Sequence, residues 1–174
     1  MRAQVQSYLN RARIAAQRES VLARTEVEPV LERLVRVMRK LNPGKSFDLV
    51  IRQKGLRLAM EAQDLEETIG NLVENASRYA VSQVRLVAAP APAGVRGADP
   101  GRRNWALITI EDDGPGLEPD QIKEAMRLDE SKPGTGLGLS IVSEIVGEYQ
   151  GSLSLSRGQG GGLRAELVLP AIVN

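Results

Sequence analysis

The chain has 174 residues, enough to bury one substantial core, and 42% of them are hydrophobic. Its 23 Lys and Arg residues nearly balance its 22 Asp and Glu residues, so its net charge of +1 attracts neither nucleic acid nor an acidic membrane as a whole. With no cysteine or histidine, the chain has no disulfides, no usual zinc site and no Cys–His or Ser–His–Asp catalysis. It also lacks an apolar run as long as a membrane span.

Hydrophobic periodicity predicts a helix over residues 2–22. Its apolar stripe is narrow, so it either packs on its own domain or is half of a helical hairpin whose other half is missing. A second helix is predicted over residues 28–41. Residues 47–53 and 56–61 then favour two short strands, paired as a hairpin around the Lys54-Gly55 turn.

The next predicted helix begins at Asp64, with Glu67 as the second member of a capping-box pair. Its apolar face comprises Leu65, Ile69, Leu72, Val73 and Ala76. A polar stripe is expected on the opposite side, made of Asn71, Asn75, Arg78 and Tyr79. We therefore expect one face to pack on a sheet, while the other is either a solvated surface or a binding site.

The second half of the chain alternates strands and helices. Strands are expected over residues 82–89 and 105–113, the second of them central in the sheet because its apolar residues are nearly continuous. A Pro/Gly-rich surface loop joins the two, and a short helix is expected over residues 118–126.

A helix over residues 139–150 is predicted to direct five residues to the core: Ile141, Val142, Ile145, Val146 and Tyr149. Two closing strands, 151–157 and 163–170, follow it and are joined by a glycine-rich turn. The predicted fold is a mixed α/β sandwich, with helices on one face of a largely antiparallel sheet and an additional helix at the N-terminus.

Two glycine-containing motifs and the polar helix stripe suggest chemistry. In "EDDGPGL" (111–117), a carboxylate at a strand end can accept a hydrogen bond from the exocyclic amine of adenine, and two glycines leave main chain free for a flat ligand. In "PGTGLGLS", alternating glycines precede a helix, where backbone N–H groups bind phosphates. On the polar stripe, the amide of Asn75 could ligate Mg²⁺. Taken singly, these features also fit an ordinary turn, a flexible linker and a solvated face.

In this order, the motifs "GNLVENASRY", "EDDGPGL" and "RLDESKPGTGLGLSIV", with the closing "GGGLRAELVLP", resemble the N, G1 and G2 boxes of the GHKL ATPase/kinase superfamily. The chain is most similar to the catalytic ATP-binding domain of bacterial sensor histidine kinases, in particular their PhoQ-like branch. The resemblance covers about residues 25–172 and implies the Bergerat, or GHKL, ATP-binding fold with ATP and Mg²⁺ as ligands.

The resemblance also implies roles for individual residues. Asn75 would coordinate Mg²⁺, Asn71 would be the polar catalytic-site residue one turn earlier, Arg78 would lie near the phosphates and Tyr79 against the nucleoside. Asp112, rather than Asp113, would bind adenine. The remaining residues would shape the pocket or form a lid over the phosphates, with Lys132 also as a catalytic-site candidate: Gly114, Gly116, Lys132, Gly134, Thr135, Gly136, Leu137 and Gly138. Arg127 is a further candidate for a phosphate contact.

The segment "YLNRARIAA" resembles the end of the second helix of the dimerisation and phosphoacceptor hairpin of these kinases. We therefore expect residues 1–24 to be a remnant of that hairpin and residues 25–174 to be the catalytic domain. The expected partner is the phosphoacceptor domain of a parent kinase, which would be a homodimeric inner-membrane sensor with this domain in the cytoplasm. A response regulator would act indirectly, and neither nucleic acid nor membrane contact is expected.

One alternative is a degenerate domain that binds partners and no nucleotide, but all three boxes look intact. Two enzymatic alternatives are an ATP-hydrolysing GHKL module and a serine kinase of the anti-sigma-factor type. Both resemble this chain in the ATP pocket, but they carry a glutamate one turn before the Mg²⁺-binding asparagine. Here that position is Asn71, which cannot act as a general base. The chain also departs from many family members because it has no phenylalanine-bearing box ahead of the lid; its one phenylalanine is Phe47.

Overall fold

The computed structural model of the chain describes residues 23–126 and 139–172. The helix predicted over residues 2–22 therefore lies outside the described residues. The elements follow in the order β1 (Thr25–Glu26), α2 (Val27–Leu41), β2 (Ser46–Ile51), β3 (Arg57–Leu58), α3 (Ala62–Tyr79), β4 (Gln83–Pro90), β5 (Trp105–Asp112), α4 (Pro119–Met126), α5 (Leu139–Glu148), β6 (Ser152–Arg157) and β7 (Leu163–Ile172).

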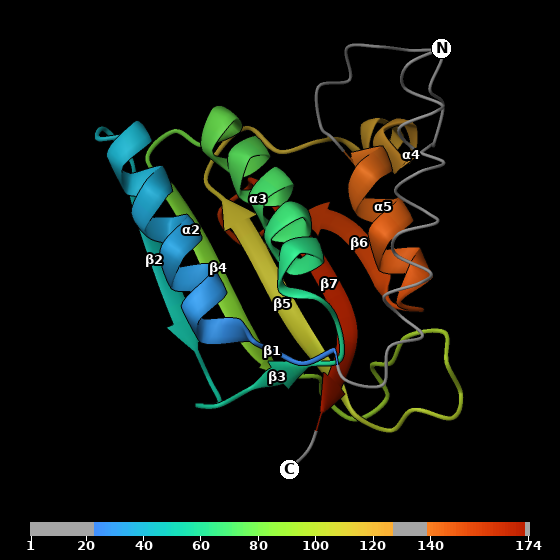
Figure 1. Cartoon of the computed structure of the whole chain (residues 1–174). Helices are drawn as coiled ribbons and strands as arrows, with labels where there is room; N and C mark the ends of the chain where they lie inside the picture. The colour runs from blue at the N-terminus through green and yellow to red at the C-terminus, as the bar shows by residue number, and fades with distance from the viewer. Residues whose placement is uncertain (1–22, 127–138, 173–174) are drawn as a thin grey trace, which may run out of the picture.

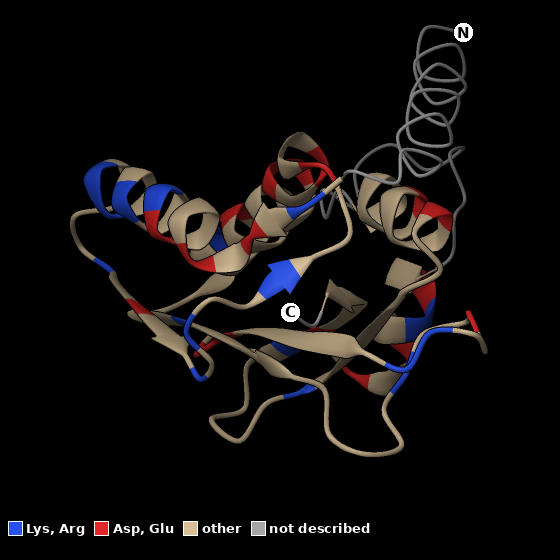
Figure 2. Ribbon diagram, turned by 60° about the horizontal axis from the view of Figure 1, so that its bottom comes forward, with Lys and Arg blue, Asp and Glu red and all other residues tan. Residues whose placement is uncertain are grey.

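The strands form a seven-stranded sheet in the order β1-β3-β7-β5-β4-β2, with β6 paired to β7. Every pair is antiparallel except β2 with β4. Helices α2, α3 and α5 lie together on one face of the sheet (Figures 1 and 2). This arrangement confirms the predicted fold class, a largely antiparallel sheet with helices on one face.

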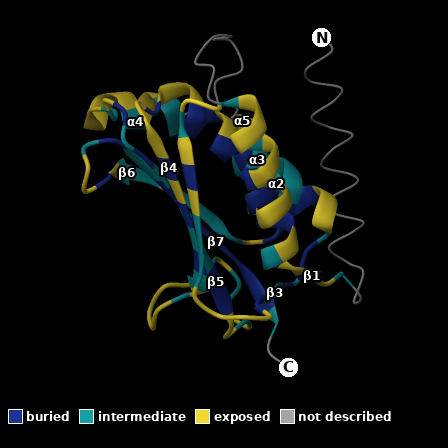
Figure 3. Ribbon diagram, turned by 90° about the vertical axis from the view of Figure 1, so that its left-hand side faces the viewer, coloured by how far each residue is buried: buried dark blue, intermediate teal, exposed yellow. Residues whose placement is uncertain are grey.

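The core lies between the helices and the sheet, where the buried residues gather in Figure 3. Along β5, alternate side chains point to opposite faces, so Ala106, Ile108 and Ile110 are buried under the helices. The apolar face of α3, including Leu65 and Ile69, packs over this strand. The nearly continuous apolar run of β5 is explained by its place between β4 and β7, as predicted for a central strand.

The predicted hairpin of residues 47–61 is wrong. β2 pairs with β4 in parallel, with Phe47 opposite Val84, whereas β3 pairs antiparallel with β1 and β7, with Leu58 opposite Ala171. Parallel strands need a long crossover connection, and α3 provides it between β2 and β4. The Lys54-Gly55 turn therefore leads the chain away from β2 instead of folding it back.

The capping-box prediction at Asp64 is also wrong. Helix α3 begins at Ala62, and its N-cap residue, Glu61, makes no side-chain cap. Asp64 is instead completely buried, and its Oδ2 accepts a hydrogen bond of 2.6 Å from the Tyr149 hydroxyl. That hydroxyl in turn accepts one from the Glu61 N–H. Burial, together with this carboxylate, raises the pKa of Tyr149, and the contact ties α3 to the end of α5.

Helix α5 meets the core with four of its five predicted residues, Val142, Ile145, Val146 and Tyr149. The fifth, Ile141, is 37% exposed, and Leu139 is buried in addition. The apolar residues of this helix form one stripe, and Ile141 lies at the border of that stripe, next to the polar side, which explains its exposure.

The loop of residues 91–104 crosses the surface, as expected, and packs at the end of the sheet where β5 begins. The Ala98 N–H donates to the carbonyl of Gln150, and the Arg102 guanidinium donates to the carbonyl of Ala171. Trp105 donates its indole N–H to the Arg102 carbonyl. This end of the sheet is remote from the end of β5, where the candidate site lies. Among the described residues, no helix combines the length and the apolar character needed to cross a membrane.

Candidate functional site

Two adjacent aspartates stand where β5 ends. Because successive residues of a strand point to opposite sides, Asp112 points under the helices and is only 5% exposed, while Asp113 points outward. Both carboxylates have defined partners, and these partners differ. The two residues therefore have different structural roles.

Asp113 fixes the turn between α3 and β4. Its carboxylate accepts hydrogen bonds from the N–H groups of Val81, Ser82 and Gln83 at 2.9–3.0 Å, and from the Ser82 hydroxyl at 2.6 Å. Desolvation alone would raise the pKa of Asp113, but these hydrogen bonds outweigh it and hold the pKa well below its usual range. Asp113 thus acts as a cap for three successive backbone donors of the turn.

Asp112 has fewer partners and a more apolar surrounding. Its Oδ1 accepts the N–H of Gly114 at 2.8 Å and the N–H of Leu163 at 3.4 Å. Burial raises the pKa of Asp112 above its ordinary value of 3.8, and the two N–H groups offset this only in part. Within the described part of the chain, Oδ2 accepts no hydrogen bond. It therefore remains available to a ligand.

Asp112 lines a small cavity between the helices and the sheet. The lining comes from α3, β5, α5, β6 and β7: Leu72, Asn75, Ala76, Ile110, Asp112, Leu139, Leu155, Leu163 and Ala165. Asn75 and Asp112 are the polar residues of this lining; the others are apolar. Ligand pockets commonly combine apolar walls with a few well-placed polar groups, and this composition suits a flat ring with a hydrogen-bonding edge.

The structure separates the four residues of the predicted polar stripe on α3. Asn75 is only 8% exposed and lies beside Leu72 and Ala76 in the cavity wall, so it does not lie opposite the apolar face as predicted. Tyr79 is 42% exposed, and Arg78 is exposed and pairs with Glu74 at 3.8 Å.

Asn71 is partly buried, one turn before Asn75. Its side-chain N–H donates to the carbonyl of Glu67 at 2.7 Å. The structure therefore brings Asn75 and Asp112 to one cavity. It leaves Asn71, Arg78 and Tyr79 outside the cavity lining.

The glycines of "EDDGPGL" are required by close packing against the protein's own backbone, while their predicted role in shaping the ligand pocket stays a prediction. A Cβ at Gly114 would lie 2.2 Å from the carbonyl oxygen of Tyr79, where α3 ends. Gly116 has a φ of +71°, and its Cβ would lie 2.3 Å from the carbonyl oxygen of Gly161. Both positions therefore let this loop pack against protein backbone.

Sequence reasoning missed the contribution of the β6–β7 turn, residues 158–162. A Cβ at Gly162 would lie 1.9 Å from the carbonyl oxygen of Asp112, and the next residue, Leu163, supplies the second N–H to the carboxylate. The sequence signal for this contact was the run of three glycines at 160–162. A turn by itself needs fewer glycines, so the extra ones indicate that another segment packs closely against it.

The remaining predicted site residues, Lys132, Gly134, Thr135, Gly136, Leu137 and Gly138, lie outside the described residues, as does Arg127. Leu139, which lines the cavity, immediately follows them in the chain. Their predicted phosphate contacts therefore stay predictions.

The oxygen donors at the cavity suit a metal ion that takes most of its ligands from water and substrate instead of from protein. No group of three or more Asp, Glu, His or Cys side chains in residues 23–126 and 139–172 could hold a metal ion. Mg²⁺ commonly takes one or two oxygens from protein and completes its shell with water and substrate phosphates. The side-chain oxygen of Asn75 can serve as such a ligand.

Comparison with known proteins agrees with this fold. Residues 60–172 match the family described as histidine kinase-, DNA gyrase B-, and HSP90-like ATPase. The sensor protein kinase CarS of Pseudomonas aeruginosa is 41% identical over 120 residues, covering 67% of this chain and 24% of CarS. The two-component sensor PhoQ of the same organism is 31% identical over 144 residues, covering 80% of this chain and 30% of PhoQ.

Among solved structures, full-length ShkA in complex with AMPPNP has a TM-score of 0.74 at 22% identity, covering 99% of this chain and 36% of that chain. The fold and site define an ATP-binding α/β sandwich. The chain belongs to the histidine kinase-, DNA gyrase B-, and HSP90-like ATPase family, as a catalytic ATP-binding domain of the sensor histidine kinase type. It spans less than a third of the length of CarS and PhoQ.

Proposed function

We propose that the chain binds ATP with Mg²⁺ in the cavity at Asp112 and delivers the γ-phosphoryl group to a histidine on a phosphoacceptor hairpin outside the chain. The observation that carries this proposal is the pairing of Asp112 and Asn75 in an otherwise apolar cavity. The relatives CarS and PhoQ are named as sensor kinases, and the ShkA structure contains an ATP analogue.

In the proposed complex, Asp112 accepts a hydrogen bond from the exocyclic amine of adenine, and the apolar walls exclude water from the ring. Asn75 holds Mg²⁺, which supplies charge neutralisation at the phosphates. Arg78 and Tyr79 lie at the exposed end of α3 and would contact the phosphates and nucleoside from there. Lys132 and the glycines of residues 134–138 would complete the phosphate contacts.

The proposed reaction depends on positioning and charge neutralisation more than on acid–base chemistry of this chain. The nucleophile is the histidine of the hairpin, since this chain has none. In this proposal residues 1–24 are the remnant of that hairpin, and residues 25–174 are the catalytic domain. The parent would be a homodimeric membrane sensor that holds this domain in the cytoplasm and passes the phosphoryl group onward to a response regulator.

Asn71 disfavours the two alternatives, an ATP-hydrolysing module and a serine kinase. Both would place a glutamate there as general base, whereas an amide cannot accept a proton from water or a hydroxyl at neutral pH. Its N–H already donates to the Glu67 carbonyl. The kinase proposal therefore requires low ATP hydrolysis by the isolated chain.

The direct test is to incubate the chain with γ-labelled ATP, Mg²⁺ and the separate phosphoacceptor hairpin of its parent. We expect acid-labile label on the hairpin histidine, and none when that histidine is replaced by alanine. Rapid release of labelled phosphate without hairpin labelling would favour the ATPase alternative. No labelling with ATP binding confirmed would refute the kinase proposal.

A binding test isolates the metal ligand. In calorimetric titrations with AMPPNP, Asn75→Ala is expected to weaken binding in Mg²⁺ by roughly tenfold or more, since an Mg²⁺ ligand is lost. In EDTA, the variant and the wild type should bind with similar affinity. An equal loss in both conditions would show that Asn75 shapes the cavity without holding the metal.

A further inference from the structure

We propose that Glu111, on the face of β5 opposite to the cavity, is a positioning residue that holds the β6–β7 turn against Asp112. The inference rests on the proposed nucleotide site and concerns how that site is built. Glu111 does not line the cavity and cannot touch a nucleotide there. It acts through the turn of residues 158–162, which supports the adenine-binding carboxylate from behind.

The first contact of Glu111 is with the neighbouring strand. Glu111 and Arg164 are directly opposite each other in the antiparallel pair β5–β7. Nη2 of Arg164 lies 3.4 Å from Oε2 and 3.5 Å from Oε1 of the carboxylate, and both side chains are partly buried. A cross-strand ion pair of this kind fixes the direction of the Glu111 side chain.

The second contact is with the turn itself. Oε1 of Glu111 accepts the backbone N–H of Gln159 at 2.9 Å. A Cβ at Gly158 would lie 1.9 Å from the same oxygen, so the carboxylate rests directly on the turn backbone. The turn is closed by hydrogen bonds between Gly158 and Gly162 (2.6 Å) and between Gly161 and Gly158 (3.0 Å), and therefore moves as a unit.

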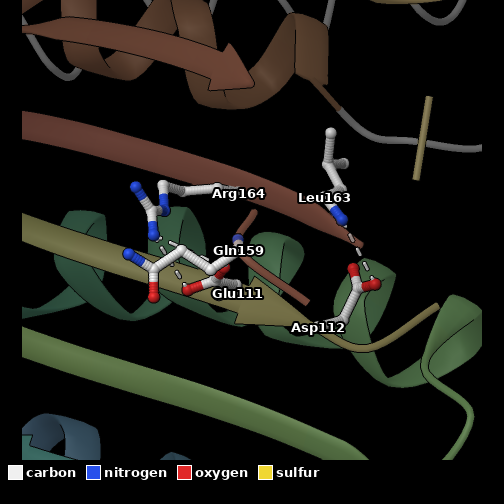
Figure 4. Close-up of polar contacts among 5 residues, drawn as sticks. All are labelled: Glu111, Asp112, Gln159, Leu163 and Arg164. Atoms are coloured by element: carbon white, nitrogen blue, oxygen red, sulfur yellow. Dashed lines mark hydrogen bonds and ion pairs between the residues drawn. The ribbon is translucent and has the colours of Figure 1, made fainter. Parts of the chain in front are cut away.

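The other side of the turn meets Asp112. The Leu163 N–H donates to Oδ1 of Asp112, and Gly162 lies against the Asp112 main chain. Because adjacent residues of β5 point to opposite faces, Glu111 and Asp112 hold the same turn from its two sides. Figure 4 shows both contacts: Gln159 and Arg164 at Glu111, and Leu163 at Asp112.

Of the two contacts that hold the turn, the weaker one is the hydrogen bond to Asp112, the residue proposed to bind the ligand. At 3.4 Å, the hydrogen bond from Leu163 to Asp112 is near the limit of a normal N–H···O distance, so a small displacement of the turn would break it. Asp112 would then keep only the Gly114 N–H, and its carboxylate would be free to rotate away from the ligand. Glu111 therefore affects nucleotide affinity without touching nucleotide.

The turn offers a matched pair of variants. Gly158→Ala places a methyl group on the Glu111 carboxylate and displaces it without changing any charge. Gly160→Ala adds the same methyl group two residues away, where nothing lies within 4 Å. In calorimetric titrations with AMPPNP and Mg²⁺, we expect Gly158→Ala to weaken binding roughly tenfold and Gly160→Ala to leave it unchanged.

A second pair tests Glu111 directly. Glu111→Ala removes the acceptor for Gln159 and should weaken AMPPNP binding about as much as Gly158→Ala does. Glu111→Gln keeps an oxygen that can accept this N–H and should restore binding to within about threefold of wild type. In amide NMR spectra, the Leu163 resonance should shift and exchange faster in the alanine variant than in the glutamine variant.

The inference would be overturned if folded Glu111→Ala and Gly158→Ala bound AMPPNP as wild type does, with the Leu163 amide unchanged. It would also be overturned if Glu111→Gln lost as much affinity as Glu111→Ala. If the proposed nucleotide site itself were wrong, the result would be different: the wild-type chain would bind no AMPPNP, or Asp112→Asn would bind it with wild-type affinity.

Discussion

Replacing Asp113 by alanine removes every hydrogen bond that its side chain makes to the α3–β4 turn. The N–H groups of Val81, Ser82 and Gln83 and the Ser82 hydroxyl all lose their acceptor. The neighbouring Asp112 keeps its own partners in this variant. The substitution therefore tests the role of Asp113 without changing the contacts of Asp112.

The loss of stability follows from these contacts. A capping carboxylate or hydroxyl is typically worth about 0.5–2 kcal/mol, and hydrogen bonds to a charged group are at the upper end. Because the contacts with Asp113 are at the surface, water can replace them in part, so we expect a loss of about 1–2 kcal/mol in the free energy of unfolding. For a domain of this size, this lowers Tm by roughly 2–8 °C.

Urea unfolding at several pH values measures this loss. The pKa of Asp113 is lowered in the folded state, so its stabilising contribution is fully present above the ordinary value of 3.8 and disappears as the pH falls through the folded-state pKa. The difference between wild type and Asp113→Ala should therefore be constant from pH 6 to 8 and shrink progressively below pH 4.

The matched variant is Asp112→Asn, which should lower nucleotide affinity instead of stability. It removes a buried carboxylate whose pKa is raised, so we expect little loss of stability at neutral pH but at least a tenfold loss in AMPPNP affinity. The reasoning would be refuted if Asp113→Ala abolished nucleotide binding while Asp112→Asn bound normally, because the two roles would then be exchanged.

Two further substitutions test how the fold is held together. Tyr149→Phe removes the hydroxyl that donates to buried Asp64, and we expect it to lower the free energy of unfolding in urea by about 1–3 kcal/mol. The control Tyr79→Phe, at an exposed position, should lower it by almost nothing. Equal losses would contradict the buried link between α3 and α5. Gly116→Ala should cost at least about 1–2 kcal/mol in thermal unfolding, because of its positive φ and the nearby Gly161 carbonyl, and an unchanged Tm would show that the loop has room to move.

The elements of this fold were largely predictable because their apolar patterns are local. The run of apolar residues from Trp105 to Ile110 indicated a central strand, and the structure places β5 between two neighbours. The choice of strand partners was not predictable in the same way. The Lys54-Gly55 turn favours a hairpin locally, but β2 gains its partner from β4, more than 30 residues later in the chain.

Sequence reasoning could locate the residues of the candidate site whose type suggests their chemistry. It could not locate the features of the structure that depend on tertiary contacts. Asn75 and Asp112, taken from two separate motifs, lie in one cavity. By contrast, Asp64 has the sequence position of a helix-capping residue, yet its partner is Tyr149, which is 85 residues away. Helical periodicity also misplaced Asn75, since a residue at the border of the apolar face can be buried by a neighbouring strand.

The position of β7 in the sheet has a consequence for synthesis on the ribosome. β7 lies between β3 and β5 and also pairs with β6, so it joins three strands made at different times. Until residues 163–172 have left the exit tunnel, Asp112 lacks the Leu163 donor and β5 has an open edge. Such edges favour aggregation, and pairings distant in sequence form slowly. Nascent chains stalled before Leu163 should therefore depend on chaperones and should not be retained on immobilised ATP.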